Sequence, residues 1–290
     1  MKIYLAIHLP KQLANHPTIL QIDIDPSELG NIYPIDEGLC GDARLALADL
    51  RQALEDIRQS PRERDSWVND IIRNKAAWRA QVERRAADSD QGIRPQRVIQ
   101  ELQRNLPDDA ILISDPGTPT PFVSAEYELR KPGRWAISPR AQGGLGYAIP
   151  GVVGARLAKP DAPIVGLCGD GSFAMSAGDL ATITRMGGPT ILILFNNGCY
   201  GWIKALQKLH HGGRYFSVDF TEPLNYRQIA EGFGLRVLDV HTPDEIGPAI
   251  QRALSHGAPC FIELVTPGEH ELIPPVAEWQ RVAKEVTHQN

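Results

Sequence analysis

Short apolar runs alternate with amphipathic stretches along the second two-thirds of this 290-residue chain. The runs Ile164–Cys168 and Thr190–Phe195 have the length and content of strands that are buried on both faces of a parallel sheet. Stretches with apolar residues at helical spacing follow these runs. Strands that alternate with helices in this way predict βαβ units. We therefore expect an α/β fold, a doubly wound parallel sheet with helices on both faces.

The same patterns assign the other elements of this sheet. Turn residues, mainly Gly and Pro, separate most of them. The expected strands are Ala110–Ser114, Ile164–Cys168, Thr190–Phe195, Leu235–Val240 and Cys260–Val265, and the expected helices lie at about Pro95–Asn105, Leu145–Leu157, Ser176–Met186, Asn225–Phe233 and Pro243–Ser255.

The first third of the chain has a different pattern. Thr18–Asp25 alternates as a strand and stops at Pro26, and Asp42–Ile57 has leucines at helical spacing. Residues 60–92 carry dense charge with a few spaced apolar residues, which indicates a solvent-facing amphipathic helix and a linker. We therefore divide the chain into residues 1–60, a charged helix and linker over 61–92, a main domain over 93–270, and a tail over 271–290.

Composition and charge exclude several classes of protein. The formal net charge of −5 argues against a surface for nucleic acid or for an anionic membrane. The four cysteines form no CxxC pair, which argues against a zinc site or a disulfide framework. The sequence has no secretory signal and no apolar stretch of the length that a membrane span needs. We expect a cytoplasmic protein that binds neither nucleic acid nor membrane.

Two loops with candidate chemistry follow the two most apolar strands. Asp170 lies in a Gly-Asp-Gly-Ser turn after the first strand, and Asn196 and Asn197 follow the second. Ligands of parallel α/β sheets bind beyond the carboxyl ends of the strands, so these side chains would converge if the strands were neighbours. A carboxylate and an amide oxygen are suitable ligands for Mg²⁺.

The glycines of the first loop point to a second ligand. They allow the backbone to approach a phosphate, and the N–H groups of Gly171 and Ser172 would open a helix, whose amino end attracts anions. Asp-Gly and Asn-Gly are common turn dipeptides, and either alone would be read as a turn. Together, with Asp170 and Asn197 27 residues apart, they predict a site for Mg²⁺ and a diphosphate.

This pair of loops resembles the signature of enzymes that depend on thiamine diphosphate (ThDP). The stretch AQGGLGYAIPGVVGARLAKPDAPIVGLCGDGS is similar to the cofactor domain of the family that contains acetolactate synthase and benzoylformate decarboxylase. The resemblance spans about Pro95–Pro267, and Ile19–Leu54 resembles the end of the same family's central domain. It implies that residues 1–60 are a remnant of a central α/β domain and that 93–270 bind the diphosphate and Mg²⁺ of ThDP.

The resemblance also implies roles for single residues. Asp170, Asn197 and the backbone carbonyl of Cys199 correspond to the Mg²⁺ ligands. Leu145 corresponds to the apolar residue that holds ThDP in its V shape, and the carbonyl of Gly143 to the acceptor of the 4′-amino group; these two are the expected catalytic residues. The expected cofactor-binding residues are Gly117, Thr118, Gly143, Leu145, Gly169, Asp170, Gly171, Ser172, Asn197, Cys199 and Tyr200.

Several nearby residues have an ordinary explanation beside the functional one. The thiol of Cys199 is expected to play no part, since its carbonyl is the group of interest. For Trp202 and Ile203, lining of the pocket and ordinary packing stay open as alternatives. His210 and His211 are expected to form a solvated pair.

The resemblance leaves out one part of the family's active site. In this family a Glu on a separate pyrimidine-binding domain contacts the aminopyrimidine of ThDP, and no stretch of these 290 residues resembles that domain. We expect either a subunit of a split enzyme or a fragment. The initiating Met and the continuous central-domain remnant favour a subunit, in a hetero-oligomer such as a heterotetramer with two copies of each chain.

The resemblance implies a ThDP- and Mg²⁺-dependent decarboxylase or carboligase that acts on a 2-oxo acid, similar to acetolactate synthase. A benzoylformate decarboxylase-like enzyme or a C–C lyase is the alternative within the family. A non-catalytic subunit that stabilises or regulates a ThDP enzyme is the alternative from another class. The sequence leaves open whether FAD is also bound.

Overall fold

The computed structural model describes residues 18–32, 34–57, 65–88, 92–139, 142–222, 224–272, 274–276 and 279. These residues divide into two compact units between Ala76 and Ala77. The division lies inside one long helix, α2 (Asp65–Ala87), rather than at a loop. We describe each unit by itself, and the domain boundaries expected at residues 60, 92 and 270 stay predictions.

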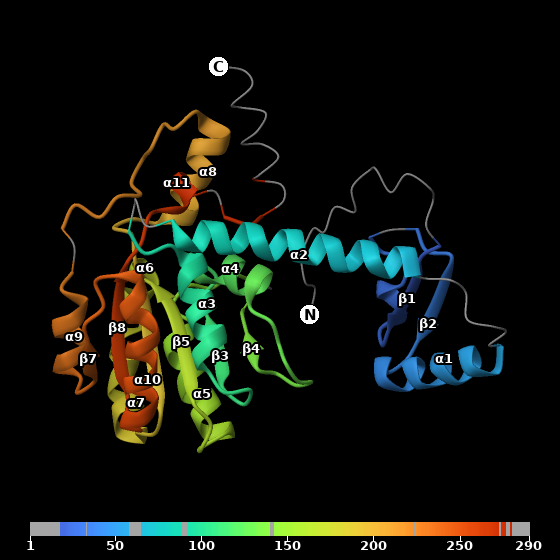
Figure 1. The fold of residues 1–290 in the computed structure, drawn as a ribbon, viewed down its shortest axis with the longest axis horizontal. Coiled ribbons are helices and arrows are strands. Elements are labelled where there is room, and N and C mark those ends of the chain that lie inside the picture. The colour runs from blue at the N-terminus through green and yellow to red at the C-terminus, as the bar shows by residue number, and fades with distance from the viewer. Residues whose placement is uncertain are drawn as a thin grey trace. The chain divides into compact units, whose positions relative to one another are not determined.

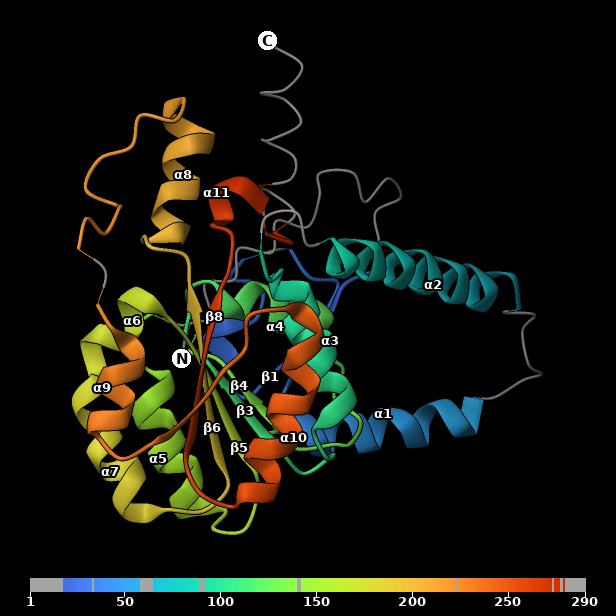
Figure 2. The ribbon, with the colours of Figure 1, turned by 60° about the vertical axis from the view of Figure 1, so that its left-hand side comes forward.

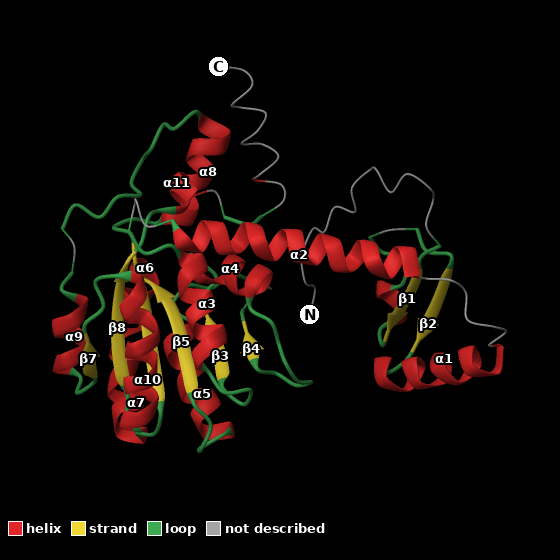
Figure 3. Cartoon of the chain, in the orientation of Figure 1, coloured by secondary structure: helices red, strands yellow, loops and turns green. Residues whose placement is uncertain are grey.

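The larger unit alternates strands and helices along the chain (Figure 3). Several of its connections are Gly or Pro turns, which explains the regular alternation of the sequence pattern. Its strands are β3 (Ile111–Ser114), β4 (Ala136–Ile137), β5 (Ile164–Gly169), β6 (Thr190–Asn196), β7 (Arg236–Leu238) and β8 (Cys260–Val265). Its α-helices after α2 are α3 (Pro95–Asn105), α4 (Pro119–Glu126), α5 (Ala148–Ala158), α6 (Asp170–Ser176), α7 (Leu180–Met186), α8 (Gly201–His211), α9 (Tyr226–Gly232), α10 (Ile246–His256) and α11 (Glu269–Leu272), with 3₁₀ turns at Ala177–Asp179 and Pro243–Glu245.

The strands of this unit form one parallel sheet in the order β4-β3-β5-β6-β8-β7. The expectation of a doubly wound parallel α/β sheet is therefore confirmed. β5 and β6 are neighbours, with Gly169 opposite Phe195. The loops that follow them consequently leave the same edge of the sheet, as the sequence predicted for strands that pair in parallel.

Two apolar clusters hold helices against the two faces of the sheet. One face is covered by α3 and α10, which bury residues such as Leu102 and Ile250 against Ile193 and its neighbours. The other face is covered by α5, α7 and α9, through residues such as Ile149. Figure 2 shows the two helical layers with the strands between them. β6 is buried along almost its whole length because both layers cover it, which explains its continuous apolar sequence.

Some elements differ from the sequence expectation. The helix expected over Ser176–Met186 consists of the 3₁₀ turn at Ala177–Asp179 and α7, and a separate helix, α6, covers Asp170–Ser176 directly after β5. The expected helix at Leu145 begins at Ala148, because the preceding glycines adopt a turn. α4 and β4 were not predicted: α4 contains two prolines near its start and β4 has two residues, so neither shows a periodic pattern.

The smaller unit contains a two-stranded parallel sheet. β1 (Leu20–Asp23) pairs with β2 (Glu37–Cys40), a 3₁₀ turn at Pro26–Glu28 follows β1, and α1 (Ala43–Ile57) follows β2. The strand and helix expected here are confirmed. Among the described residues, no helix has the length and apolar character needed to cross a membrane.

Candidate functional site

A cavity of about 360 Å³ lies at the carboxyl edge of the parallel sheet. In Figure 1, α8 and α11 lie at this edge. The cavity walls come from the loops after β3 and β6, from the end of β5 and the start of α6, from the loop before α5, and from the start of α8. Ten of the eleven predicted cofactor-binding residues line it. The full lining is Pro116, Gly117, Thr118, Gln142, Gly143, Leu145, Gly169, Asp170, Gly171, Ser172, Cys199, Tyr200, Gly201, Trp202 and Ile203.

Asp170, the first residue of α6, joins the two predicted metal loops. Its side chain is 3% exposed. Oδ2 accepts hydrogen bonds from the backbone N–H groups of Asn197 (3.0 Å) and Gly198 (2.7 Å), and Oδ1 accepts one from Gly171 (2.8 Å). The carboxylate therefore fixes the turn after β6 while keeping unused acceptor capacity on its oxygens.

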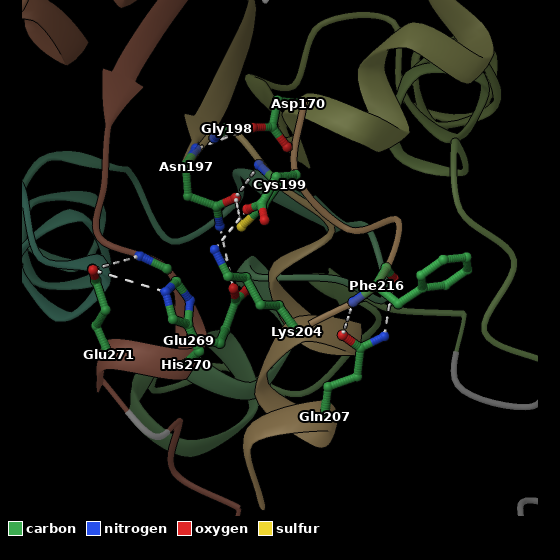
Figure 4. A network of polar contacts seen from close by, with 12 residues as sticks. Asp170, Asn197, Gly198, Cys199, Lys204, Gln207, Phe216, Glu269, His270 and Glu271 are labelled. Atoms are coloured by element: carbon green, nitrogen blue, oxygen red, sulfur yellow. Dashed lines mark hydrogen bonds and ion pairs between the residues drawn. The ribbon is translucent and has the colours of Figure 1, made fainter. Parts of the chain in front are cut away.

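Asn197, the eleventh predicted residue, is not among the residues that line the cavity, and its side chain reaches toward Cys199 and Glu269 (Figure 4). Its Nδ2 donates to Thr118 Oγ1 (3.3 Å) and to Glu269 Oε2 (3.2 Å). Its Oδ1 accepts from the backbone N–H of Cys199 (3.3 Å) and from the Cys199 thiol (3.4 Å). The amide thus connects the loops after β3 and β6 with α11.

Cys199 and its neighbours close the cavity from the β6 side. The backbone carbonyl of Cys199, the third predicted metal ligand, accepts a hydrogen bond from the N–H of Gly201 (2.9 Å). Cys199 is 3% exposed, and burial raises the pKa of its thiol to about 12. A thiol in this state is a poor nucleophile, which agrees with the expectation that it plays no part.

The turn around Gly171 requires a residue without a side chain. A Cβ atom at this position would lie 2.6 Å from a ring carbon of Tyr200. Ser172, two residues into the helix, exchanges hydrogen bonds with the backbone of Gly169 (3.0 Å each), which fixes the start of α6. The predicted diphosphate loop is therefore compact, and both Gly171 and Ser172 line the cavity.

The loop before α5 supplies the opposite wall. Gly143 and Gly146 have φ angles of +65° and +81°, a backbone conformation that favours glycine. Leu145 between them is 42% exposed, although it lines the cavity. An apolar side chain held open to solvent at a cavity wall is available to contact a ligand.

The two residues whose role the sequence left undecided both line the cavity. Trp202 and Ile203 are on the first turn of α8. Trp202 also packs against the ring of Trp279, with the centroids 4.3 Å apart. Both alternatives therefore hold for Trp202. His210 and His211, at the other end of α8, are exposed, as expected.

Sequence reasoning missed two buried acids. Asp115, at the end of β3, accepts a hydrogen bond on Oδ1 from the N–H of Tyr147 (2.8 Å), and so anchors the start of α5. Glu269, the first residue of α11, is 1% exposed and accepts from Asn197. Asp115 opens the stretch DPGTPT, which follows a predicted strand and contains the predicted residues Gly117 and Thr118, so it could have been found there; Glu269 follows the last strand with no motif around it.

Burial controls the electrostatics of this site. Removal from water raises the pKa of Asp115, Asp170 and Glu269, and hydrogen bonds to each carboxyl group lower it in part. Three buried acids favour a cation. Among the residues that the structure describes, no group of three or more His, Cys, Asp or Glu side chains is placed to hold a metal. The donors expected from Asp170, Asn197 and Cys199 are all oxygens, the donor type that a hard cation takes.

Comparisons with known proteins identify related sequences. A family model described as the thiamine pyrophosphate enzyme, C-terminal TPP binding domain, matches residues 115–264; thiamine pyrophosphate (TPP) is another name for ThDP. A probable acetolactate synthase large subunit of Methanococcus aeolicus is 28% identical over 282 residues, which cover 92% of this chain and 46% of that one. A probable sulfoacetaldehyde acetyltransferase of Rhizobium meliloti is 29% identical, with 85% and 45% covered.

A solved structure has the same fold. The thiamine diphosphate-dependent 4-hydroxybenzoylformate decarboxylase of Rhodococcus jostii superposes with a TM-score of 0.69 at 24% identity, over 88% of this chain and 45% of that one. The chain therefore spans less than half the length of these relatives.

Proposed function

The chain belongs to the thiamine pyrophosphate enzyme family, whose C-terminal TPP-binding domain it contains, and from this premise we propose a function for its cavity. The cavity binds the diphosphate half of ThDP together with Mg²⁺, in a 2-oxo-acid decarboxylase or carboligase similar to acetolactate synthase. The observation that carries the proposal is the convergence of Asp170, the Gly171 turn and the glycine loop before α5 on one cavity.

The oxygen donors in and beside the cavity fit this group. Asp170, Asn197 Oδ1 and the Cys199 carbonyl would hold Mg²⁺, since all three present oxygen and none requires a soft ligand. Gly171 and Tyr200 both line the cavity, and any side chain at Gly171 would displace the Tyr200 ring, so the backbone of this loop is left bare at the cavity wall. When bound, ThDP supplies the nucleophilic carbon and the electron sink for reactions at a 2-oxo group.

The apolar wall has a separate task. Leu145 would support the cofactor between its two rings, and the carbonyl of Gly143 would accept a hydrogen bond from its amino group. Trp202 and Ile203 would restrict water in the cavity, because they line it from the start of α8. Exclusion of water protects a reactive centre from side reactions.

We further propose that a pyrimidine-binding domain with its catalytic Glu comes from a partner chain. One observation supports this: the smaller unit exposes large apolar side chains, the kind of surface that marks an interaction site. Those more than half exposed on α1 and the start of α2 are Leu45, Leu47, Leu54, Ile57, Trp67 and Ile72.

Purification from the native source tests the proposal. We expect a second chain to copurify, and the complex to release CO₂ from at least one member of a panel of 2-oxo acids when ThDP and Mg²⁺ are present. Product analysis then separates carboligation from simple decarboxylation. A complex that neither binds ThDP nor acts on any 2-oxo acid would contradict the proposed function and would favour a non-catalytic subunit.

A further inference from the structure

The side-chain amide of Asn197 connects three segments beside the proposed metal site. Asn197 follows β6, Thr118 follows β3, and Glu269 opens α11 after β8. Both hydrogens of the Asn197 amide have an acceptor, Thr118 Oγ1 at 3.3 Å and Glu269 Oε2 at 3.2 Å. Because an amide NH₂ has two donors, the nitrogen is saturated on this side.

The saturation of the nitrogen determines where the oxygen points. An amide side chain could be turned by half a rotation with little change in shape, and its hydrogen-bond partners decide between the two orientations. A carboxylate that faces the nitrogen excludes the reversed orientation, because Oδ1 would then face another acceptor. Oδ1 is thereby kept on the side of Cys199, whose N–H and thiol donate to it.

We propose that Glu269 is a positioning residue that orients Asn197 so that its amide oxygen is presented to Mg²⁺. The inference rests on the proposed function, since it concerns the same site. Glu269 lies outside the residues that match the family model, 115–264, and would not contact the metal itself.

The surroundings of Glu269 show that its position is built into the fold. The side chain is 1% exposed, and Oε1 has no hydrogen-bond partner among the described residues. A buried carboxylate with an unpaired oxygen costs stability, so its presence calls for a reason other than packing. Gly201 makes room for it, because a Cβ at that position would lie 1.7 Å from Glu269 Oε2 and 2.8 Å from Asn197 Nδ2.

Two substitutions at Glu269 separate positioning from a structural role. Glu269→Met keeps the volume but removes the acceptor, whereas Glu269→Gln can still present an oxygen to Asn197. The neighbouring Glu271 provides the matched control: its side chain is 47% exposed, and Glu271→Gln leaves the contacts of Asn197 in place. Gly201→Ala displaces the same carboxylate, because the new Cβ atom would occupy its place.

The measurement is the Mg²⁺ concentration that gives half-maximal ThDP binding in calorimetry on the full chain. We expect Glu269→Met to raise it by about 10- to 100-fold, as for loss of an outer-shell partner. Gly201→Ala should act in the same direction, Glu269→Gln should fall between Met and the wild type, and Glu271→Gln should stay within about twofold. The unfolding midpoint without ligands should change little for Glu269→Met, because the removal of a buried carboxylate offsets the loss of one acceptor for Asn197.

The outcomes distinguish the inference from the function on which it rests. If the wild-type chain shows no Mg²⁺-dependent ThDP binding, the proposed function fails and the inference fails with it. If the wild type binds and Glu269→Met has the same Mg²⁺ dependence, only the inference is overturned. It is also overturned if Glu269→Met lowers the unfolding midpoint while the Mg²⁺ dependence stays unchanged, since Glu269 would then be structural.

Discussion

Substitution of Asp170 by Asn tests both tasks that the structure gives to this carboxylate. Asn has the same shape but carries one NH₂ in place of an oxygen. If the NH₂ took the place of Oδ2, two backbone N–H groups would lose their acceptor; in the place of Oδ1, only Gly171 would. The amide should therefore take the second orientation.

The cost of this substitution follows from the lost hydrogen bond. One buried N–H without an acceptor costs about 1–3 kcal/mol, and the other two bonds lose their charge assistance. The removal of a buried charge offsets part of this cost, since burial already raises the pKa of Asp170. We expect the unfolding free energy without ligands to fall by about 1–2 kcal/mol.

The second task appears only with ligands. ThDP and Mg²⁺ at 100 times the dissociation constant should stabilise the wild-type chain by about 2.7 kcal/mol. Asp170→Asn should lose this increment, because its amide replaces the charged oxygen that attracts Mg²⁺. Urea unfolding with and without the ligands measures both effects on one sample.

Asp179→Asn provides a control on the same helical stretch. Asp179 is exposed, so its substitution should change stability by less than about 0.5 kcal/mol and leave the ligand increment intact. The reasoning is refuted if Asp170→Asn keeps the full ligand increment. It is also refuted if the variant is as stable as the wild type without ligands, because the three hydrogen bonds would then contribute nothing.

Three further predictions follow from the same structure. Leu145→Ala should leave the unfolding midpoint unchanged, because the side chain is 42% exposed, but should reduce the ThDP-dependent rate of the complex; an unchanged rate would contradict its role. Gly171→Ala should weaken ThDP binding measured by calorimetry, because the new Cβ would lie 2.6 Å from the Tyr200 ring, and equal affinity would show that the turn has spare room. Glu126 has no hydrogen-bond partner on either carboxyl oxygen among the described residues, and burial raises its pKa from 4.5 to about 7. The protonated form is favoured in the folded state, so its stabilising contribution is complete below pH 4.5 and is lost as the pH rises through about 7. Glu126→Gln should thus match the wild type at pH 4 and exceed it at pH 8 by up to about 3 kcal/mol in urea unfolding, and a pH-independent difference would refute the assignment.

The main sheet was predictable because its strands carry an unusually clear signal. Thr190–Asn196 is buried on both faces by α-helices, and burial of that kind requires a continuous apolar sequence. The two loops at its carboxyl edge were predictable because parallel neighbours bring them together, and β5 and β6 are neighbours. The order and register of the strands thus bring together two loops that are separate in the sequence.

The remaining elements lack a pattern of their own. β2, with the sequence EGLC, is exposed throughout, so no alternation of apolar and polar residues marks it. α11 has four residues and begins after a Pro-Gly turn, and Glu269 acquires its role only through tertiary contact with Asn197. The periodicity of the sequence does not reveal residues of this kind, because their partners are distant in the sequence.

Titration of the chain with thiamine diphosphate, in Mg²⁺ and again in a chelator, tests the central claim most directly. The claim is that this cavity binds the cofactor through its diphosphate and a metal held by Asp170. We predict saturable binding that requires Mg²⁺, and no comparable binding of thiamine, which lacks the diphosphate. Binding of thiamine with equal affinity, or binding of thiamine diphosphate that is indifferent to Mg²⁺, would contradict the account.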